Sequence, residues 1–358
     1  MGRVTFPFGP QHPVLPEAIQ LQLTCEDERV IEVMPVIGYM HRGIEKAAEK
    51  NPFVNNVFLC ERICGICSFI HAHCYCELIE NVMRIKAPPR AAYLRVFWGE
   101  LSRIHSHLLW MGLLADSFGF ESLFMQCWRA REIVLDILEM TTGQRVIQSS
   151  SVIGGVRRDI NGETACRIRK MLERFGKEYD ACFGVFKNDY TVKQRTVGKG
   201  VLSREQAWAL GAVGPTLRGS GVAYDARMLR YGAYRELGFE PVVETAGDSY
   251  ARMMVRAREI HQSLELAFQA LDSLPESELA VKVAGFPEGE GMIRVEQPRG
   301  ELFEYVRGNG TARLERLKVR TPTFANIPTL LAMLPGCELA DVPVIVMSID
   351  PCIACTER

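Results

Sequence analysis

The sequence predicts an α+β protein that is mainly α, with a central bundle of long helices and small β-sheets near the N- and C-terminal segments. Helical periodicity dominates the middle of the chain, and strand-like alternation precedes it. From Gly285 onward the composition shifts to glycine, glutamate and β-branched residues. We therefore expect one domain with an N-terminal β-hairpin region (1–38), a helical core (39–284) and a region of small strands that ends in a metal-binding segment (285–358).

The N-terminal region contains two short segments in which apolar and polar residues alternate. These are residues 18–23 and 30–33, and the acidic residues 26–28 separate them. Alternation with a period of two indicates a strand with one buried face, so we expect a β-hairpin.

The middle of the chain contains the apolar spacing of long helices. Pro89 is well placed as the first residue of one of them, because its missing N–H has no partner in a first turn anyway. Asp248 is a good N-cap for another. The expected helices are 68–84, 89–114, 123–140, 163–186 and 248–274.

The last region predicts short strands at 292–296, 302–306 and 314–319. Residues 308–310, Gly-Asn-Gly, are a turn signal between the second and third of these. The apolar run 342–349 is expected to form a final strand.

Composition and charge exclude several classes of protein. The 358 residues are 47% hydrophobic and 24% charged, which is typical of a globular protein. The net charge is −1, so no overall positive field favours nucleic acid. The apolar runs fall far short of the roughly 20 residues that cross a bilayer. We expect a soluble chain that keeps its 12 cysteines reduced, with a minority of them binding metal.

Two Cys-x-x-Cys pairs stand out, at Cys64 and Cys67 and at Cys352 and Cys355. Residues three apart on a helical turn face the same way, so each pair can place two sulfurs on one ion. Four thiolates select zinc, iron–sulfur, nickel or copper. On spacing alone, a structural zinc site, an iron–sulfur cluster and a catalytic thiolate site all remain open.

The residues around the pairs narrow the choice. Residues 62–71 and 350–358 resemble the two metal-binding signatures of nickel–iron hydrogenase large subunits, Arg-x-Cys-Gly-x-Cys-x-x-x-His and Asp-Pro-Cys-x-x-Cys-x-x-His/Arg. Other segments resemble the 49-kDa subunit of respiratory complex I; they are 9–13, 41–46, 217–221 and 247–252. The combination is similar to the energy-converting, membrane-bound hydrogenases of the Ech and CO-induced type.

This resemblance implies a nickel–iron centre with carbon monoxide and cyanide on the iron. It also implies reversible formation of H₂ from protons and electrons. Cys64 and Cys352 would be terminal nickel ligands, and Cys67 and Cys355 would bridge the two metals. By the same resemblance Cys352 is the sulfur that accepts the proton.

Two further catalytic residues follow from the resemblance. Glu17 aligns with the family's proton-relay glutamate, and its alternative is a solvated loop carboxylate. Arg299 resembles the arginine over the iron's diatomic ligands, where a guanidinium donates hydrogen bonds without losing its charge. Its alternative is a surface ion pair.

Supporting roles are implied for four more residues. His71 would donate a hydrogen bond to a bridging sulfur, and its alternative is a core histidine. Asp350 and Asp116 resemble supporting carboxylates of the family, although Asp116 also fits a helix surface. Arg62 is expected as a charge partner near the centre.

The end of the second signature departs from many family members. Those members have a histidine that binds magnesium or iron together with a glutamate at the position of Glu45. Here the position is Arg358, and arginine is not a metal ligand at neutral pH. A magnesium or iron ion there is therefore doubtful, and we expect Glu45 to pair with an arginine instead.

The resemblance also implies partners. Electrons would arrive through a small subunit with a proximal four-iron cluster, fed by a ferredoxin-type iron–sulfur subunit. Integral membrane subunits would translocate ions at the cytoplasmic face of the cell membrane. Two alternatives remain: a complex I-type quinone-site subunit without metal, and a structural zinc or iron–sulfur interaction module.

Overall fold

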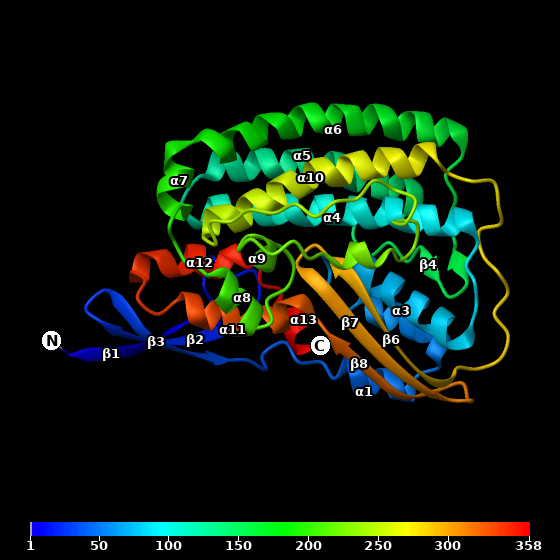
Figure 1. Cartoon of the computed structure of the whole chain (residues 1–358), viewed down its shortest axis with the longest axis horizontal. Helices are drawn as coiled ribbons and strands as arrows, with labels where there is room; N and C mark the ends of the chain where they lie inside the picture. The colour runs from blue at the N-terminus through cyan, green and yellow to red at the C-terminus, as the bar shows by residue number, and fades with distance from the viewer. Residues whose placement is uncertain (1) are drawn as a thin grey trace.

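The computed structural model describes residues 2–358 and has a helical layer stacked on small sheets (Figure 1). Four long helices run alongside one another in this layer (Figure 1), namely α4 (Pro89–Ser117), α5 (Glu121–Thr142), α10 (Ser249–Asp272) and α6 (Gly162–Asn188). Of these, α6 lies at the outer edge of the layer (Figure 1). The predicted fold class, α+β and mainly α, is confirmed.

Burial explains the order of the helices. Nearly every residue of α4 from Leu94 to Met111 is buried, as expected of a helix that has neighbours on all sides. In contrast, α6 buries a single stripe that includes Ile168, Leu172 and Phe175, and its other face meets solvent. The helix α4 is therefore the central helix, and its side chains reach both the helical core and the sheets beneath the layer.

The predicted helix starts agree with the structure. Pro89 opens α4, and the side chain of Asp248 accepts a hydrogen bond from the N–H of Ala251 at 2.8 Å, which caps α10. The helix α3 (Ser68–Met83) matches the first expected helix and packs against the C-terminal sheet.

The N-terminal sheet is antiparallel in the order β1–β2–β3. The hairpin expected from alternation is β2 (Gln20–Glu26) with β3 (Arg29–Val36), and β1 (Arg3–Phe8) adds a third strand that the alternation did not indicate. Leu21 and Leu23 of β2 are fully buried, so the alternating positions do face the core.

The C-terminal sheet contains β6 (Glu288–Gln297), β7 (Gly300–Asn309) and β8 (Leu314–Arg320), all antiparallel. Only Pro298 and Arg299 connect β6 to β7. This tight reversal is possible because Gly300 adopts a φ of +131° and packs against Gly214, where a Cβ would meet backbone. It places Arg299 at the tip of the sheet.

The final strand predicted at 342–349 is wrong, because this segment is the helix α12 (Val342–Ser348). Its apolar run is continuous rather than alternating, and such a run fits a buried helix as well as a buried strand. Pro343 in the first turn suits a helix start. Trp110 of α4 donates from Nε1 to the carbonyl of Met347 at 2.6 Å, which fixes α12 against the bundle.

The shorter elements connect these layers. The helices are α1 (Ile44–Lys50), α2 (Asn56–Glu61), α7 (Tyr190–Thr196), α8 (Arg204–Ala209), α9 (Gly214–Arg218), α11 (Pro322–Met333) and α13 (Ile353–Glu357); the 3₁₀ turns are η1 (Phe53–Asn55), η2 (Ala226–Leu229) and η3 (Leu339–Asp341); a small hairpin joins β4 (Ser151–Val152) to β5 (Gly155–Val156). Across residues 2–358, no helix has the length and hydrophobicity to cross a membrane.

Two apolar cores meet near the C-terminal segment. The larger one fills the helical layer and includes Cys352 and Cys355, whereas the smaller one lies around the N-terminal sheet, α11 and α12 and includes Ile353. The segment 352–355 therefore lies at the junction of the two cores.

Candidate metal centre

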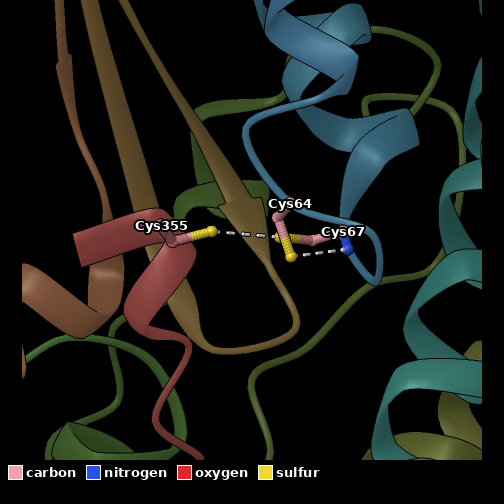
Figure 2. A group of neighbouring side chains, drawn as sticks. All are labelled: Cys64, Cys67 and Cys355. Atoms are coloured by element: carbon pink, nitrogen blue, oxygen red, sulfur yellow. Dashed lines mark hydrogen bonds between the residues drawn. The ribbon is translucent and has the colours of Figure 1, made fainter. Parts of the chain in front are cut away.

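The two cysteine pairs come together in the folded chain. Cys64 and Cys67 lie in the turn between α2 and α3, and Cys352 and Cys355 lie at the start of α13. Cys64 Sγ is 3.3 Å from Cys352 Sγ, and Cys67 Sγ is 3.6 Å from Cys355 Sγ. Figure 2 shows the sulfurs of Cys64, Cys67 and Cys355 facing one another, all within 4.8 Å. Because each cysteine is at most 2% exposed, this compact set of thiols fits a soft metal ion.

The backbone favours the ligating form of these thiols. Cys67 is the N-cap of α3 and Cys352 that of α13, and in α13 the cap sulfur itself accepts from an N–H of the first turn. Cys64 Sγ accepts from the N–H groups of Ile66 and Cys67 at 3.2 and 3.4 Å, and Cys352 Sγ accepts from Cys355 N–H at 3.4 Å. Such donors stabilise a thiolate.

Four negative charges in this dry space need a counter-charge. Hydrogen bonds from the thiols of Cys352, Cys355 and Cys67 hold the pKa of Cys64 well below its usual value. Burial raises the pKa of Cys355 well above its usual value. Ionising all four thiols therefore requires positive charge nearby, which a bound cation would supply.

Arg42 joins the two cysteine segments, and two threonines hold the second segment. Arg42 donates to the carbonyls of Arg62 at 2.7 Å and Ile63 at 2.6 Å, and to that of Ala354 at 3.2 Å. The hydroxyls of Thr321 and Thr323, at the start of α11, bind the carbonyl of Cys355 and the N–H of Cys352. None of these three residues was predicted as a site residue. Arg42 lies in the segment 41–46, which was singled out only for its resemblance to the complex I 49-kDa subunit.

Arg299 reaches the centre from the tip of the C-terminal sheet. It is 2% exposed, and it donates from Nε to the carbonyl of Asp350 at 3.0 Å and from Nη2 to Asp350 Oδ1 at 2.8 Å. Its Nη1 donates to Ser106 Oγ of α4 at 3.3 Å. Asp350 and Ser106 thus fix a buried guanidinium beside the cysteine segment.

Glu17 approaches the centre from the loop before β2. Its Oε2 accepts a hydrogen bond from the N–H of Ala354 at 2.8 Å. Burial raises the pKa of Glu17, the Ala354 N–H offsets part of this rise, and the charge of Cys64 adds to it. A half-buried carboxyl of this kind suits proton exchange.

His71 bridges a cysteine and a carboxylate that the sequence did not single out. Its Nε2 lies 3.4 Å from Cys355 Sγ, and its Nδ1 lies 3.8 Å from Glu304 Oε1. Both side chains are fully buried. Glu304 occupies a core-facing position of β7, in the same parity as Leu302 and Val306, and a charged residue at such a position was the available signal.

Two predicted residues lie outside this group. Arg62 has an exposed side chain that donates to the Phe58 carbonyl at 2.9 Å and lies 3.8 Å from Glu61 Oε2. Asp116 is exposed in the last turn of α4, and within residues 2–358 no hydrogen bond joins its side chain to the cysteines.

Glu45 has the expected arginine partner. Its Oε1 is 3.2 Å from Arg358 Nε and accepts from the N–H of Val319 at 3.0 Å, while Oε2 is 2.9 Å from Lys318 Nζ. Burial opposes ionisation, but these three donors hold the pKa of Glu45 below its usual value. Since both carboxylate oxygens already meet cationic or N–H donors, these residues do not fit a magnesium or iron ion.

Comparisons with known proteins agree with this geometry. A family model described as respiratory-chain NADH dehydrogenase, 49 Kd subunit, matches residues 117–286 and 278–358. A second model, nickel-dependent hydrogenase, matches residues 42–115.

Relatives cover almost the whole chain. The membrane-bound hydrogenase subunit alpha of Pyrococcus furiosus is 41% identical, with 99% of this chain and 87% of that protein covered. The carbon monoxide-induced hydrogenase of Rhodospirillum rubrum is 39% identical, with 100% of both covered. The chain belongs to the family of membrane-bound hydrogenase and complex I 49-kDa subunits. The resemblance drawn from the cysteine signatures is confirmed.

The family includes more than one activity. A subunit of the F(420)H(2) dehydrogenase of Methanosarcina mazei is 35% identical, with 98% of this chain and 96% of that protein covered. A chain in the structure of the membrane-bound sulfane sulfur reductase, an archaeal respiratory membrane complex, superposes with a TM-score of 0.95 at 32% identity, covering 99% of this chain and 98% of that one. Membership in this family therefore establishes that the chain belongs to an oxidoreductase family. The reaction itself has to be inferred from the residues of the site.

Proposed function

We propose that this chain is the catalytic large subunit of a membrane-bound nickel–iron hydrogenase. It catalyses reversible formation of H₂ from two protons and two electrons. The single observation that carries the proposal is the convergence of Cys64, Cys67, Cys352 and Cys355 in one buried cluster from opposite ends of the sequence. A structural zinc site would not need the proton and charge partners that surround these thiols.

The four cysteines would hold a nickel–iron centre with carbon monoxide and cyanide on the iron. When bound, such a centre supplies the heterolytic splitting of H₂. The chain's own contribution is the dry pocket and the charges around it. Arg299, held by Asp350 and Ser106, presents N–H donors to the diatomic ligands. His71 offers Nε2 to the sulfur of Cys355.

Glu17 would move the proton. We assign Cys352 Sγ as the proton acceptor during H₂ splitting and Glu17 as the group that passes the proton outward. The hydrogen bond with Cys355 lowers the pKa of Cys352, the hydrogen bond with Cys64 and burial raise it well above its usual value, and the charge of Glu17 adds to the rise. Burial raises the pKa of Glu17, which makes it a better proton acceptor than a solvated carboxylate.

Partners complete the redox reaction. Two electrons must leave or enter for each H₂, and we assign this path to a small subunit with a proximal four-iron cluster and a ferredoxin-type iron–sulfur subunit. Gly65, between the first two cysteines, is exposed, so the cysteine turn reaches the protein surface where such a subunit can bind. Integral membrane subunits would hold the complex at the cytoplasmic face of the cell membrane and translocate ions. The relatives named as a membrane-bound hydrogenase and as part of a respiratory membrane complex support the membrane association.

A second candidate is a complex I-type quinone-site subunit. The observation in its favour is the match of the 49 Kd subunit model to most of the chain. Metal analysis distinguishes the two, because that class lacks the four cysteines and binds no nickel through them.

Elemental analysis and infrared spectroscopy of the purified complex test the proposal. We expect nickel and iron together, with carbonyl and cyanide stretching bands. Stoichiometric zinc without nickel would indicate a structural site, and the absence of all three metals would favour the quinone-site subunit.

A further inference from the structure

We propose that Glu304 is the positioning residue that holds His71 with its Nε2–H directed at the sulfur of Cys355. This inference rests on the proposed function, since it concerns a sulfur that would bridge the two metals. Glu304 would thereby adjust the electron density on that sulfur without touching the metals.

The first support is the placement of the three groups. The His71 ring lies between the other two groups. Its Nδ1 is 3.8 Å from Glu304 Oε1, and its Nε2 is 3.4 Å from Cys355 Sγ. Three different elements supply them, namely β7, α3 and α13. The helix α3 packs directly against β6 and β7, and the side chains of His71 and Glu304 are fully buried.

The second support is what the carboxylate leaves unsatisfied. Neither oxygen of Glu304, nor Nδ1 of His71, has another hydrogen-bond partner among the described residues. Burial without a close partner disfavours the charged form of such a group, and it raises the pKa of Glu304. His71 Nδ1, at 3.8 Å from Glu304 Oε1, is within ion-pair range.

The third support is the neutral character of the other neighbours. Burial raises the pKa values of the thiols of Cys60 and Cys74, which both lie near Glu304, well above their usual range. They therefore stay protonated. Burial also raises the pKa of Glu304, which favours its neutral carboxyl form, and the interactions with His71 and with the Cys74 thiol offset part of that rise.

The chemistry of the ring gives the consequence. The hydrogen bond at one ring nitrogen determines whether the other carries a proton. The carboxyl group of Glu304 can donate its O–H to Nδ1, which leaves the single proton of the neutral ring on Nε2, where it can donate to the sulfur of Cys355. Without that donor, the neutral ring can place its one proton on Nδ1, and the sulfur then loses its hydrogen bond.

The test compares E304L, E304Q and H71L in the purified complex by infrared spectroscopy of the carbonyl and cyanide bands. H71L removes the hydrogen bond to Cys355 and defines the full shift. We expect E304L to move the bands in the same direction by most of that shift. E304Q keeps the bands near their wild-type positions, because its amide can donate to Nδ1 and leave the proton on Nε2. In the double variant H71L/E304L, the bands move no further than in H71L.

A second readout is independent of the nickel–iron centre. Selective ¹⁵N labelling of histidine in the same preparations, with His71 identified by its loss in H71L, reports which ring nitrogens are protonated. We expect a protonated Nε2 in the wild type and in E304Q, and its loss in E304L. The matched control is E315L, which removes an exposed carboxylate of the same sheet, one that pairs with Arg307 at 3.2 Å.

Wild-type band positions and ring protonation in E304L would overturn the inference, as would shifts that add up in the double variant. A wild-type complex without carbonyl and cyanide bands would instead refute the proposed function. In that case the nitrogen spectra alone would still decide the role of Glu304.

Discussion

Replacing Glu17 by glutamine separates proton transfer from metal binding. The carboxylate accepts one hydrogen bond, from the N–H of Ala354 at 2.8 Å, and the amide oxygen of E17Q can accept the same bond. A bond to a charged acceptor contributes about 1.5–3 kcal/mol and one to a neutral acceptor about 0.5–1.5 kcal/mol. The expected loss of local stability is therefore about 1 kcal/mol, which leaves the cysteine segment folded.

The catalytic effect is expected to be larger. A positioned acid or base contributes about 10²–10⁴-fold to rate, or roughly 3–5 kcal/mol of activation free energy. Since E17Q does not exchange a proton at this position, H₂ production and H/D exchange should both fall by that factor. Nickel content should stay at the wild-type level, because Glu17 is not among the proposed ligands.

The assay is H/D exchange under D₂, with nickel measured in each preparation. E26Q is the matched control, because it removes an exposed carboxylate of β2 and should leave exchange unchanged. Exchange at the wild-type rate in an E17Q complex that contains nickel would refute the assigned role of Glu17.

Three further outcomes follow from the structure. C64S should lower bound nickel below half of the wild-type content while the far-UV circular dichroism spectrum stays the same, because one of the four proposed soft ligands becomes a hydroxyl. R218M should destabilise the chain by about 3–5 kcal/mol in denaturant unfolding, since it removes one cationic partner from Glu259 and from two other buried carboxylates. The lowered pKa of Glu45 contributes stability above its unfolded value of about 4.3 that is lost as pH falls through the folded pKa. E45Q should therefore flatten this acid-side decline, and an unchanged pH dependence of unfolding would contradict the pairing with Arg358.

The sequence predicted the elements whose signals are local. Pro89 and Asp248 mark helix starts through their own backbone and side-chain chemistry, and both are where they were expected. The segment 342–349 shows the limit of local reasoning. Its apolar residues say that it is buried, but whether it forms a strand or a helix depends on the partners α4 and α10, which lie far away in the sequence.

The candidate site shows the same division between residues with a local sequence signal and residues without one. The cysteines could be named because thiol spacing carries chemical information by itself. Arg42 and Glu304 could not, because their roles depend on which backbone carbonyls and which ring face them after folding. Asp116 is the converse case: a resemblance named it, and the structure places it on the exposed end of α4.

Two of the segments that resemble the complex I subunit, 217–221 and 247–252, have a different role in this chain from the two cysteine signatures. Arg218, in the segment 217–221, is fully buried and binds Glu259 at 2.6 Å, Glu296 at 2.8 Å and Asp225 at 3.0 Å. In the segment 247–252, Asp248 caps α10, and Arg252 donates to two backbone carbonyls and to two serine hydroxyls.

Segments 217–221 and 247–252 stabilise the scaffold, whereas Arg42 of segment 41–46 binds the cysteine segments. The ion pairs of Arg218 join it to Asp225, Glu259 and Glu296, so this part of the scaffold has its charge balance without the metal site. This explains how relatives with the same fold can carry different reactions, because the cysteines can be lost without removing an ion-pair partner. It also sets an expectation for this chain. A variant with all four cysteines replaced by serine should unfold within about 2 kcal/mol of the metal-free wild type, whereas coupled loss of fold and thiols would mean that the centre also organises the scaffold.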